Sequence, residues 1–343
     1  MSKIVDVELE SVLKKIQDKK DIFGAEVKKM APAGYLPISL SSEGNFGVPK
    51  TIFIKNFTTE DALALAMAQE ELLPEYLIPI LNSNIWNPDE DINVSTWTEK
   101  QVIELLLKLY ANFYSPVITD IVFPLEKSDF ELLELPEYAP IRKRYEAGWK
   151  PKIDIDIRKL SFFDMTDIKI NERIRIKNKK NGLNVVFSIP RFGDFIVLKK
   201  NLKEYFFESD RKFRIIGQKI ENNDLSITLE DTIELEQYYL KKAMYTTKIT
   251  KAFYIVEFDG IDISEYSLSQ KMEVATDARL DKNVFKQYEK ELGKFQYGVD
   301  ENVQNLVHPF TNKVCTRRFT FRLYDILQDL FISNNDDYDI TYD

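Results

Sequence analysis

The chain has one histidine and one cysteine among its 343 residues, His308 and Cys315, and this limits the chemistry that its side chains could do. A structural zinc site normally needs three or four nitrogen or thiolate ligands, so these two residues could supply only part of one. A serine or cysteine nucleophile with a histidine base is possible only if His308 is that base. We therefore predict no catalytic residue set, no metal site and no cofactor, and we expect the protein to act through its shape.

The segment VHPFTNKVCTRRF places the cysteine seven residues after the histidine and just before Arg317 and Arg318. Two neighbouring guanidinium groups would lower the pKa of the Cys315 thiol, which is the electrostatic setting of a reactive cysteine. The alternative is a small buried cysteine at the start of a strand. We favour this second interpretation.

Two groups of carboxylates are further candidates for chemistry. Asp154 and Asp156 alternate along a predicted strand and so share a face, and oxygen ligands suit magnesium or calcium. No calcium-loop pattern follows them, and solvent-facing acids on an amphipathic strand are the favoured interpretation. Glu70, Glu71 and Glu75 flank a helix end, and paired carboxylates can cleave glycosides at a suitable separation. No recognisable catalytic context surrounds these glutamates.

The composition indicates a folded protein with an acidic first half. Its hydrophobic content is 44%, and its 23 Phe and 17 Tyr fit both core packing and permanent interfaces. Residues 31–150 carry 9 Lys and Arg against 18 Asp and Glu, whereas residues 151–343 carry 31 against 32. Binding of nucleic acid by the whole chain is disfavoured, because it needs a basic surface. A local basic run is best explained as a solvated strand face; it comprises Lys169, Arg173, Arg175, Lys177, Lys179 and Lys180.

Neither the N-terminus nor the apolar runs predict export or a membrane anchor. The first twenty residues are charged throughout, unlike a signal peptide. The most apolar run, 102–114, is interrupted by Glu104 and Lys108 and is too short to cross a bilayer. We therefore expect folding in a cytoplasm, where the lone cysteine stays reduced.

Helical patterns dominate the first half of the chain. Residues 1–32 predict an amphipathic N-terminal helix or arm, and such a helix usually docks on its own body or on a partner. Residues 33–150 predict a helix-rich domain with short strands. Its predicted core is a helix over 99–114, which is apolar nearly all round and starts at a capping box of Thr98 and Gln101. Shorter helices are expected after Thr58, ending near Pro74, and over 75–84.

After residue 150 the pattern changes to period-two alternation, beginning with Ile153, Ile155 and Ile157. Asn181-Gly182 tolerates the positive φ angles of a tight turn, which predicts a β-hairpin over 172–190. Further helices are expected from Asp194 onward, over 230–245 and over 282–295. A strand over 317–322 and a helix over 324–331 precede an acidic tail, 334–343. The whole of 151–343 is predicted to be a mixed region, so the fold class is α+β.

Four segments carry a family resemblance. YLPISLSSEGNFGVPKTIFIKNFTTEDALAL (35–65) has a Leu-Pro-x-x-x-Ser segment, a glycine-containing loop, a short strand and a Thr-x-Glu-Asp helix start. NGLNVVFSIPRFGD (181–194) ends a hairpin in a Pro-x-x-Gly-Asp step, and LLLKLYANFYSPVITDIVF (105–123) reads as an apolar helix followed by a strand. Together they resemble the baseplate hub family of T-even-like contractile-tailed bacteriophages. VCTRRFTF (314–321) is similar to the Cys-x-x-Cys-like segment near the end of relatives, but it keeps one cysteine, so a zinc ion is not expected here.

The resemblance implies a virion structural protein, a subunit of the tail baseplate near the hub that binds other tail proteins in a multi-subunit assembly. An alternative is a chaperone for hub assembly that is absent from the finished particle. A third hypothesis, different in class, is a hydrolase or nuclease that acts during infection. That hypothesis would be abandoned if no single substitution among Asp154, Asp156, His308 and Cys315 reduced a measured activity.

The candidate partner-binding residues lie in two segments, the loop 35–48 and the N-terminal stripe. Loops held by a rigid scaffold commonly carry recognition. The alternative is that Leu36 and Phe46 fill the core of their own domain. The candidates are Tyr35, Leu36, Pro37, Phe46, Val48, Val7 and Leu13.

Overall fold

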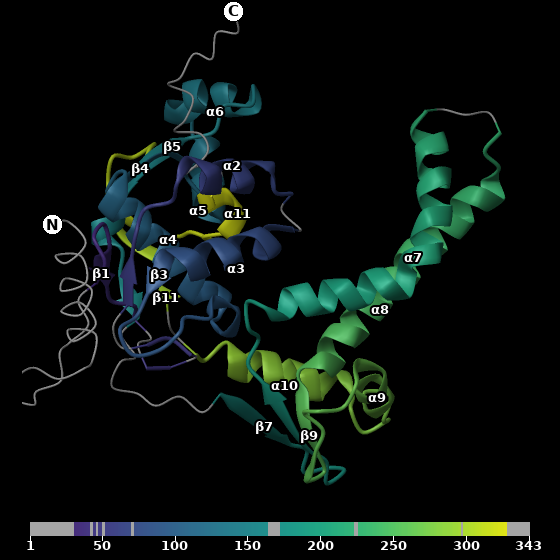
Figure 1. Ribbon diagram of the computed structural model, residues 1–343. Helices are drawn as coiled ribbons and strands as arrows, with labels where there is room; N and C mark the ends of the chain where they lie inside the picture. The colour runs from purple at the N-terminus through teal and green to yellow at the C-terminus, as the bar shows by residue number, and fades with distance from the viewer. Residues whose placement is uncertain are drawn as a thin grey trace, which may run out of the picture.

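A computed structural model describes residues 31–41, 44–45, 47–49, 52–69, 72–163, 172–222, 226–295 and 298–327. A body of small antiparallel sheets and helices carries a long helical arm that points away from it (Figure 1). Helix accounts for about 49% and strand for about 18%, which confirms the predicted α+β class. The predicted N-terminal helix and the acidic tail lie outside the described residues.

The first hydrophobic core forms around α4 (Glu99–Phe113), as the sequence predicted. Leu105, Leu106 and Leu107 are consecutive and all fully buried, so α4 is covered on nearly every side. The elements of the first half that accompany it are β1 (Leu36–Ile38), β2 (Ile52–Ile54), α2 (Thr59–Met67), α3 (Leu73–Asn84), β3 (Ile85–Trp86), η2 (Val94–Thr96), β4 (Val117–Val122), α5 (Lys127–Leu133), η3 (Pro136–Tyr138) and α6 (Ala139–Glu146).

The first core also draws on later parts of the chain. β5 (Lys152–Asp156) pairs with β4, so a sheet crosses position 150, where the sequence suggested a domain boundary. The C-terminal residues of the core return from beyond residue 298, and α11 packs against α4. These later elements are η4 (Ile157–Lys159), β6 (Phe162–Phe163), β11 (Gly298–Val299), β12 (Asn302–Val307), β13 (Val314–Arg318) and α11 (Leu323–Leu327).

A second core lies under a four-stranded sheet of order β10-β9-β8-β7. Phe187 on the middle strand β8 is fully buried, and its ring stacks on Tyr288 of α10 at 4.5 Å between centroids. The elements of this half are β7 (Arg173–Lys177), β8 (Asn184–Ser188), α7 (Asp194–Glu221), α8 (Leu229–Phe253), β9 (Ile255–Phe258), β10 (Ile261–Asp262), α9 (Leu268–Val274) and α10 (Lys282–Leu292).

The predicted hairpin over 172–190 is present, with Lys177 opposite Asn184, but its turn is wider than a two-residue turn. The Asn178 N–H donates to the Leu183 carbonyl at 2.8 Å, which closes a four-residue loop. Within the loop Gly182 has a positive φ of 74°, and Asn181 does not share it. The glycine is therefore the residue that the turn requires.

Several boundaries differ from the sequence prediction; α8, for example, ends at Phe253 and not at residue 245. α2 ends at Met67 and not near Pro74, because the chain is already extended at Ala68. Pro74 instead lies in the first turn of α3, where the missing N–H of proline costs no hydrogen bond. β13 likewise ends at Arg318, four residues before the predicted end of that strand.

Candidate protein-interaction surface

The arm consists of α7 and α8, two antiparallel helices joined by residues 222–228 (Figure 1). At a rise of about 1.5 Å per residue, helices of 28 and 25 residues are each roughly 40 Å long. α8 begins at a capping box in which the Thr228 side chain accepts from the Asp231 N–H at 3.1 Å and Asp231 accepts from the Thr228 N–H at 2.9 Å. This box fixes where the chain turns back toward the body.

Aromatic rings fill the seam between the two helices. Tyr205 stacks on Tyr245 at 3.8 Å between centroids, and Phe213 stacks on Tyr238 at 4.4 Å. Phe206, which is 3% exposed, is also buried in the seam, edge-on to Tyr245. Stacked and edge-on ring pairs contribute beyond their buried area, so the arm has an apolar interior of its own.

Two ion pairs cross the same seam. Lys212 of α7 lies 2.9 Å from Glu234 of α8, and Lys242 of α8 lies 2.6 Å from Asp210 of α7. Both ion pairs are partly exposed, so each contributes little free energy. In one pair the lysine lies on α7, and in the other it lies on α8, so together the two pairs favour a single register of the two helices.

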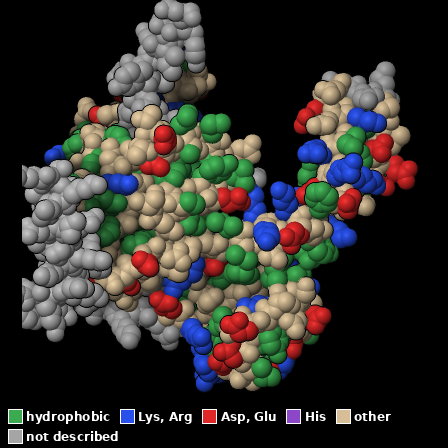
Figure 2. Space-filling view, in the orientation of Figure 1, with side chains coloured by type: hydrophobic (Ala, Val, Ile, Leu, Met, Phe, Trp, Pro, Cys, Tyr) green, Lys and Arg blue, Asp and Glu red, His purple; other side chains and the backbone are tan. Residues whose placement is uncertain are grey.

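The outer surface of the arm exposes large apolar side chains. On α8, Leu229 is 78% exposed, Leu240 66% and Met244 74%, and on α7 both Phe207 and Ile215 are more than half exposed. Green apolar side chains appear on the arm between basic and acidic ones in Figure 2. Apolar groups gathered on an exposed element mark a protein-interaction site, whereas single exposed apolar residues are ordinary.

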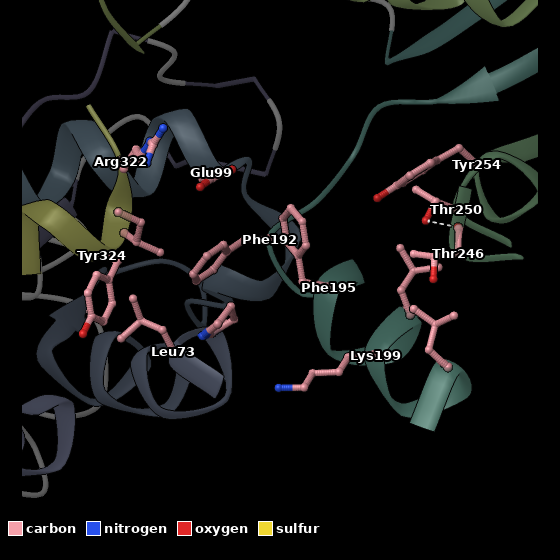
Figure 3. A pocket seen from close by; sticks show the side chains of 14 residues that line it. Leu73, Glu99, Phe192, Phe195, Lys199, Thr246, Thr250, Tyr254, Arg322 and Tyr324 are labelled. Atoms are coloured by element: carbon pink, nitrogen blue, oxygen red, sulfur yellow. Dashed lines mark hydrogen bonds between the residues drawn. The ribbon is translucent and has the colours of Figure 1, made fainter. Parts of the chain in front are cut away.

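A cleft of about 590 Å³ lies where the arm meets the body. Leu73, Phe192 and Tyr324 line it from the body, and Lys199 and Thr246 line it from the arm (Figure 3). Its walls are mainly apolar side chains, which is typical of a contact site.

Two acidic groups on this cleft are affected by burial. Desolvation raises the pKa of the Glu99 carboxyl, and it also raises the pKa of the Tyr254 hydroxyl, with a smaller contribution from the nearby negative charge of Asp194. Both shifts favour the neutral forms of these two groups.

The predicted partner-binding loop is partly exposed and partly core. Leu36 is 41% exposed and Pro37 is also exposed, both on the edge strand β1, while the Tyr35 hydroxyl donates to the Ser83 carbonyl at 3.4 Å. Val48 is 2% exposed and belongs to the first core, so it offers no surface to a partner in this conformation. Phe46, Val7 and Leu13 lie outside the described residues.

A buried carboxylate, which the sequence did not single out, holds this loop to α4. Glu104 is 0% exposed and accepts hydrogen bonds from the Ser41 N–H at 2.8 Å, the Ser41 hydroxyl at 2.6 Å and the Lys108 ammonium at 2.7 Å. The Lys108 ammonium also donates to the Ser39 carbonyl at 2.7 Å. Each charge thus has partners, which a buried ion pair requires.

His308 is buried and both of its ring nitrogens make structural hydrogen bonds. Nδ1 accepts the backbone N–H of Phe310 at 3.1 Å, so the ring hydrogen is on Nε2, which donates to Asp129 at 2.9 Å. Asp129 also accepts from Arg317 at 2.9 and 3.1 Å. This cluster connects α5 to the β12–β13 hairpin, and these contacts assign His308 a role in the fold.

Cys315 lies in β13 and is half-buried. Burial raises the pKa of its thiol, and the nearby Arg317 guanidinium only partly opposes that effect. The reactive-thiolate hypothesis expected a lowered pKa and is wrong on this point. Arg318 does not help, because its side chain pairs with Glu301 at 2.8 Å.

The other candidate residues also have ordinary structural partners. Asp156 pairs with Arg158 at 2.9 Å, and Asp154 accepts from the Asp120 N–H at 3.2 Å. Among the described residues no group of three or more His, Cys, Asp or Glu side chains is placed to hold a metal ion. Glu70 and Glu71 lie outside those residues, and Glu75 is exposed on α3.

The basic strand is solvent-facing, as the sequence predicted. Arg173, Arg175 and Lys177 are exposed along the edge strand β7, whereas the alternate residues Ile174 and Ile176 are buried. Arg175 also has a counterion, Glu257, at 3.2 Å. Charged side chains on an edge strand oppose pairing with another strand.

Sequence reasoning identified both arm helices but not the surface that they form. The signal for that surface was a set of apolar residues on α8, at positions that do not face α7.

No family model matches the chain, and no curated protein and no solved structure matches it. None of the helices in the described ranges combines the length and the apolar character that crossing a bilayer requires.

Proposed function

We propose that the chain is a structural subunit of a contractile bacteriophage tail baseplate and binds other tail proteins through its helical arm. The observation that carries the proposal is the arm itself, which exposes large apolar side chains along helices that do not contribute to either core beyond their bases. The family resemblance of residues 35–65 and 181–194 supports the assignment to a tail.

Assembly subunits need surfaces that are apolar enough to bind and rigid enough to be specific. The ring-filled seam of the arm supplies the rigidity and its outer face supplies the apolar groups. The edge strand β1 with Leu36 and Pro37 is a second, smaller surface of the same kind.

Quantitative mass spectrometry of purified phage particles tests the proposal. A structural subunit is expected at a fixed copy number relative to the other baseplate proteins. If the protein is present in infected cells but absent from particles, the structural role is wrong and the hub-assembly chaperone becomes the better hypothesis.

Co-purification tests the role of the arm. Phe207→Ser and Ile215→Ser change exposed residues of α7 and leave the seam intact, so they are expected to weaken capture of tail proteins without lowering thermal stability. Val122→Ser, at an exposed position on β4, is the matched control. Equal loss in the control would show that binding does not depend on the arm.

A further inference from the structure

α8 carries an exposed apolar stripe that is formed by Leu229, Ile233, Leu240 and Met244 and is interrupted for one turn by the polar residues Glu236 and Gln237. The four apolar side chains are 78%, 45%, 66% and 74% exposed. Their spacings of four, seven and four residues correspond to about one, two and one helical turns, so they align along one side of the helix. The seam residue Tyr238, on the opposite side, is only 7% exposed. The stripe also borders a shallow groove of about 430 Å³ on the outer face of α8.

The charges of α8 are segregated along its length. Its first eight residues contain Glu230, Asp231, Glu234 and Glu236 and no basic residue, while the remainder contains Lys241, Lys242, Lys248 and Lys251 and no acidic residue. This order stabilises any single helix through its dipole. The order of the charges along α8 therefore does not by itself indicate a binding partner. Their positions beside the apolar stripe do.

Three of these charges flank the stripe on the same side. Lys241 and Lys248 follow Glu230 by eleven and eighteen residues, about three and five turns, so all three lie along one line. None of the three has an ion-pair partner among the described residues, in contrast to Glu234 and Lys242, which pair with α7. An acidic end and a basic end are thus exposed beside an apolar stripe.

We propose that a second copy of this chain covers the stripe, with the two α8 helices antiparallel about a two-fold axis. An axis between Glu236 and Gln237 places Ile233 opposite Leu240 and Leu229 opposite Met244. The same axis places Glu230 of one copy between Lys241 and Lys248 of the other. One symmetry operation therefore pairs the apolar positions and brings Glu230 near Lys241 and Lys248, as an isologous contact requires, while the two copies of Glu236 lie beside the axis on the opposite flank.

A parallel pair does not fit the same surface. About a two-fold axis parallel to the helices, the flank that carries Glu230, Lys241 and Lys248 lies on opposite sides of the pair in the two copies, so the acidic and basic ends do not meet. A different protein would need a complementary apolar surface and charges in matching order to fit equally well. The second copy supplies that pattern directly, and the inference is independent of the assembly in which the protein acts.

Sedimentation of the purified full-length chain at low salt tests the proposal. The interface is small, so we expect a concentration-dependent monomer–dimer equilibrium. Glu230→Lys alone, or Lys241→Glu with Lys248→Glu, is expected to weaken dimerisation at least tenfold by opposing like charges. Lys200→Glu, an exposed position on α7, is the charge-matched control and is expected to leave the equilibrium unchanged.

Mixing the two charge variants separates pairing from damage to the helix. An equimolar mixture of the Glu230→Lys and the Lys241→Glu, Lys248→Glu proteins juxtaposes opposite charges again, so heterodimers are expected to form with near-wild-type affinity. A helix that had simply been destabilised would not recover on mixing. A wild-type chain that stays monomeric at about 100 μM, or a dimer that neither charge variant weakens, would overturn the proposal.

Discussion

At the scale of single residues, the buried carboxylate of Asp129 holds together a cluster that includes His308, the one histidine of the chain. It accepts hydrogen bonds from His308, Arg317 and the Glu126 N–H, the last at 2.8 Å. Asp129→Asn would leave the buried Arg317 guanidinium with only the more exposed Glu126 carboxylate, 3.7 Å away, and breaking a buried ion pair costs about 3–5 kcal/mol of unfolding free energy. Urea unfolding at pH 7 measures this loss. Asp89→Asn, at an exposed position, is the control and is expected to change stability little.

The pH dependence of stability gives a second test of Asp129. Burial raises the pKa of its carboxyl, but the hydrogen bonds from Glu126, His308 and Arg317 lower it more, so the folded-state pKa lies below its ordinary value. A lowered folded-state pKa contributes stability above the unfolded pKa of about 3.9, and that contribution is lost as pH falls through the folded value. The stability difference between the wild type and Asp129→Asn is therefore expected to be constant near pH 6–7 and to shrink below about pH 4.

The partly buried thiol of Cys315 gives a prediction about chemical reactivity. Its pKa is raised by burial in β13, so little thiolate is present at neutral pH and the sulfur is only partly accessible. Iodoacetamide is therefore expected to alkylate the folded protein several-fold more slowly than the urea-unfolded chain at pH 8. Equal rates in the two states would contradict the burial argument.

At the scale of helices and strands, two glycines form a matched pair. A methyl group added at Gly217 in α7 or at Gly182 in the β7–β8 turn meets no atom within 4 Å, so neither substitution causes a clash. Gly182 has a φ of 74°, whereas Gly217 is in a regular helix. The two sites therefore differ in backbone conformation and not in packing.

Gly217→Ala is expected to stabilise α7 by about 0.5–1 kcal/mol, because alanine is the better helix former. Gly182→Ala is expected to destabilise the hairpin by about 1 kcal/mol, because an L-residue is strained at that φ. Hydrogen exchange of the arm amides measures the first effect, and chemical unfolding measures the second. Changes of the same sign would contradict the assignment.

The elements that the sequence predicted correctly are those whose signal is local. The capping box of Thr98 and Gln101 starts α4 where expected, with the Thr98 N–H donating to the glutamine at 2.7 Å. The alternation of Ile174 and Ile176 with arginines likewise predicts β7 and its exposed edge. Both patterns depend on neighbours within four residues, which a sequence displays directly.

What the sequence could not provide is how distant segments meet. The cluster of Asp129, His308 and Arg317 joins residues separated by up to 188 positions, and no local pattern connects them. The exposed stripe on α8 was hidden for a related reason, because apolar residues occur on both sides of that helix and only the position of α7 shows which side is covered. Exposure is a property of the assembled hairpin.

At the scale of the whole molecule, the arm meets the body mainly at the bases of its two helices, where α8 packs against α9. Neither core includes a residue between 199 and 252 among the described residues, and the buried side chains of the arm, such as Phe206 and Tyr238, pack within the seam. Units with separate apolar interiors can unfold independently. The outer surface of the arm is therefore not needed for either core and can contact a partner.

Shortening the arm tests this independence. Replacing residues 208–242 with a Gly-Ser linker of about five residues removes Leu229, Ile233 and Leu240 of the stripe. It keeps the Tyr205–Tyr245 stack at the cut, where the rings are 3.8 Å apart. Because both cores remain intact, the Tm of the body is expected to change by less than about 3 °C, which corresponds to roughly 1 kcal/mol. The same variant is expected to be monomeric and to lose tail-protein capture. A large drop in Tm, measured by calorimetry, would show instead that the arm stabilises the body, and the exposed side chains on α8 would then need a structural explanation.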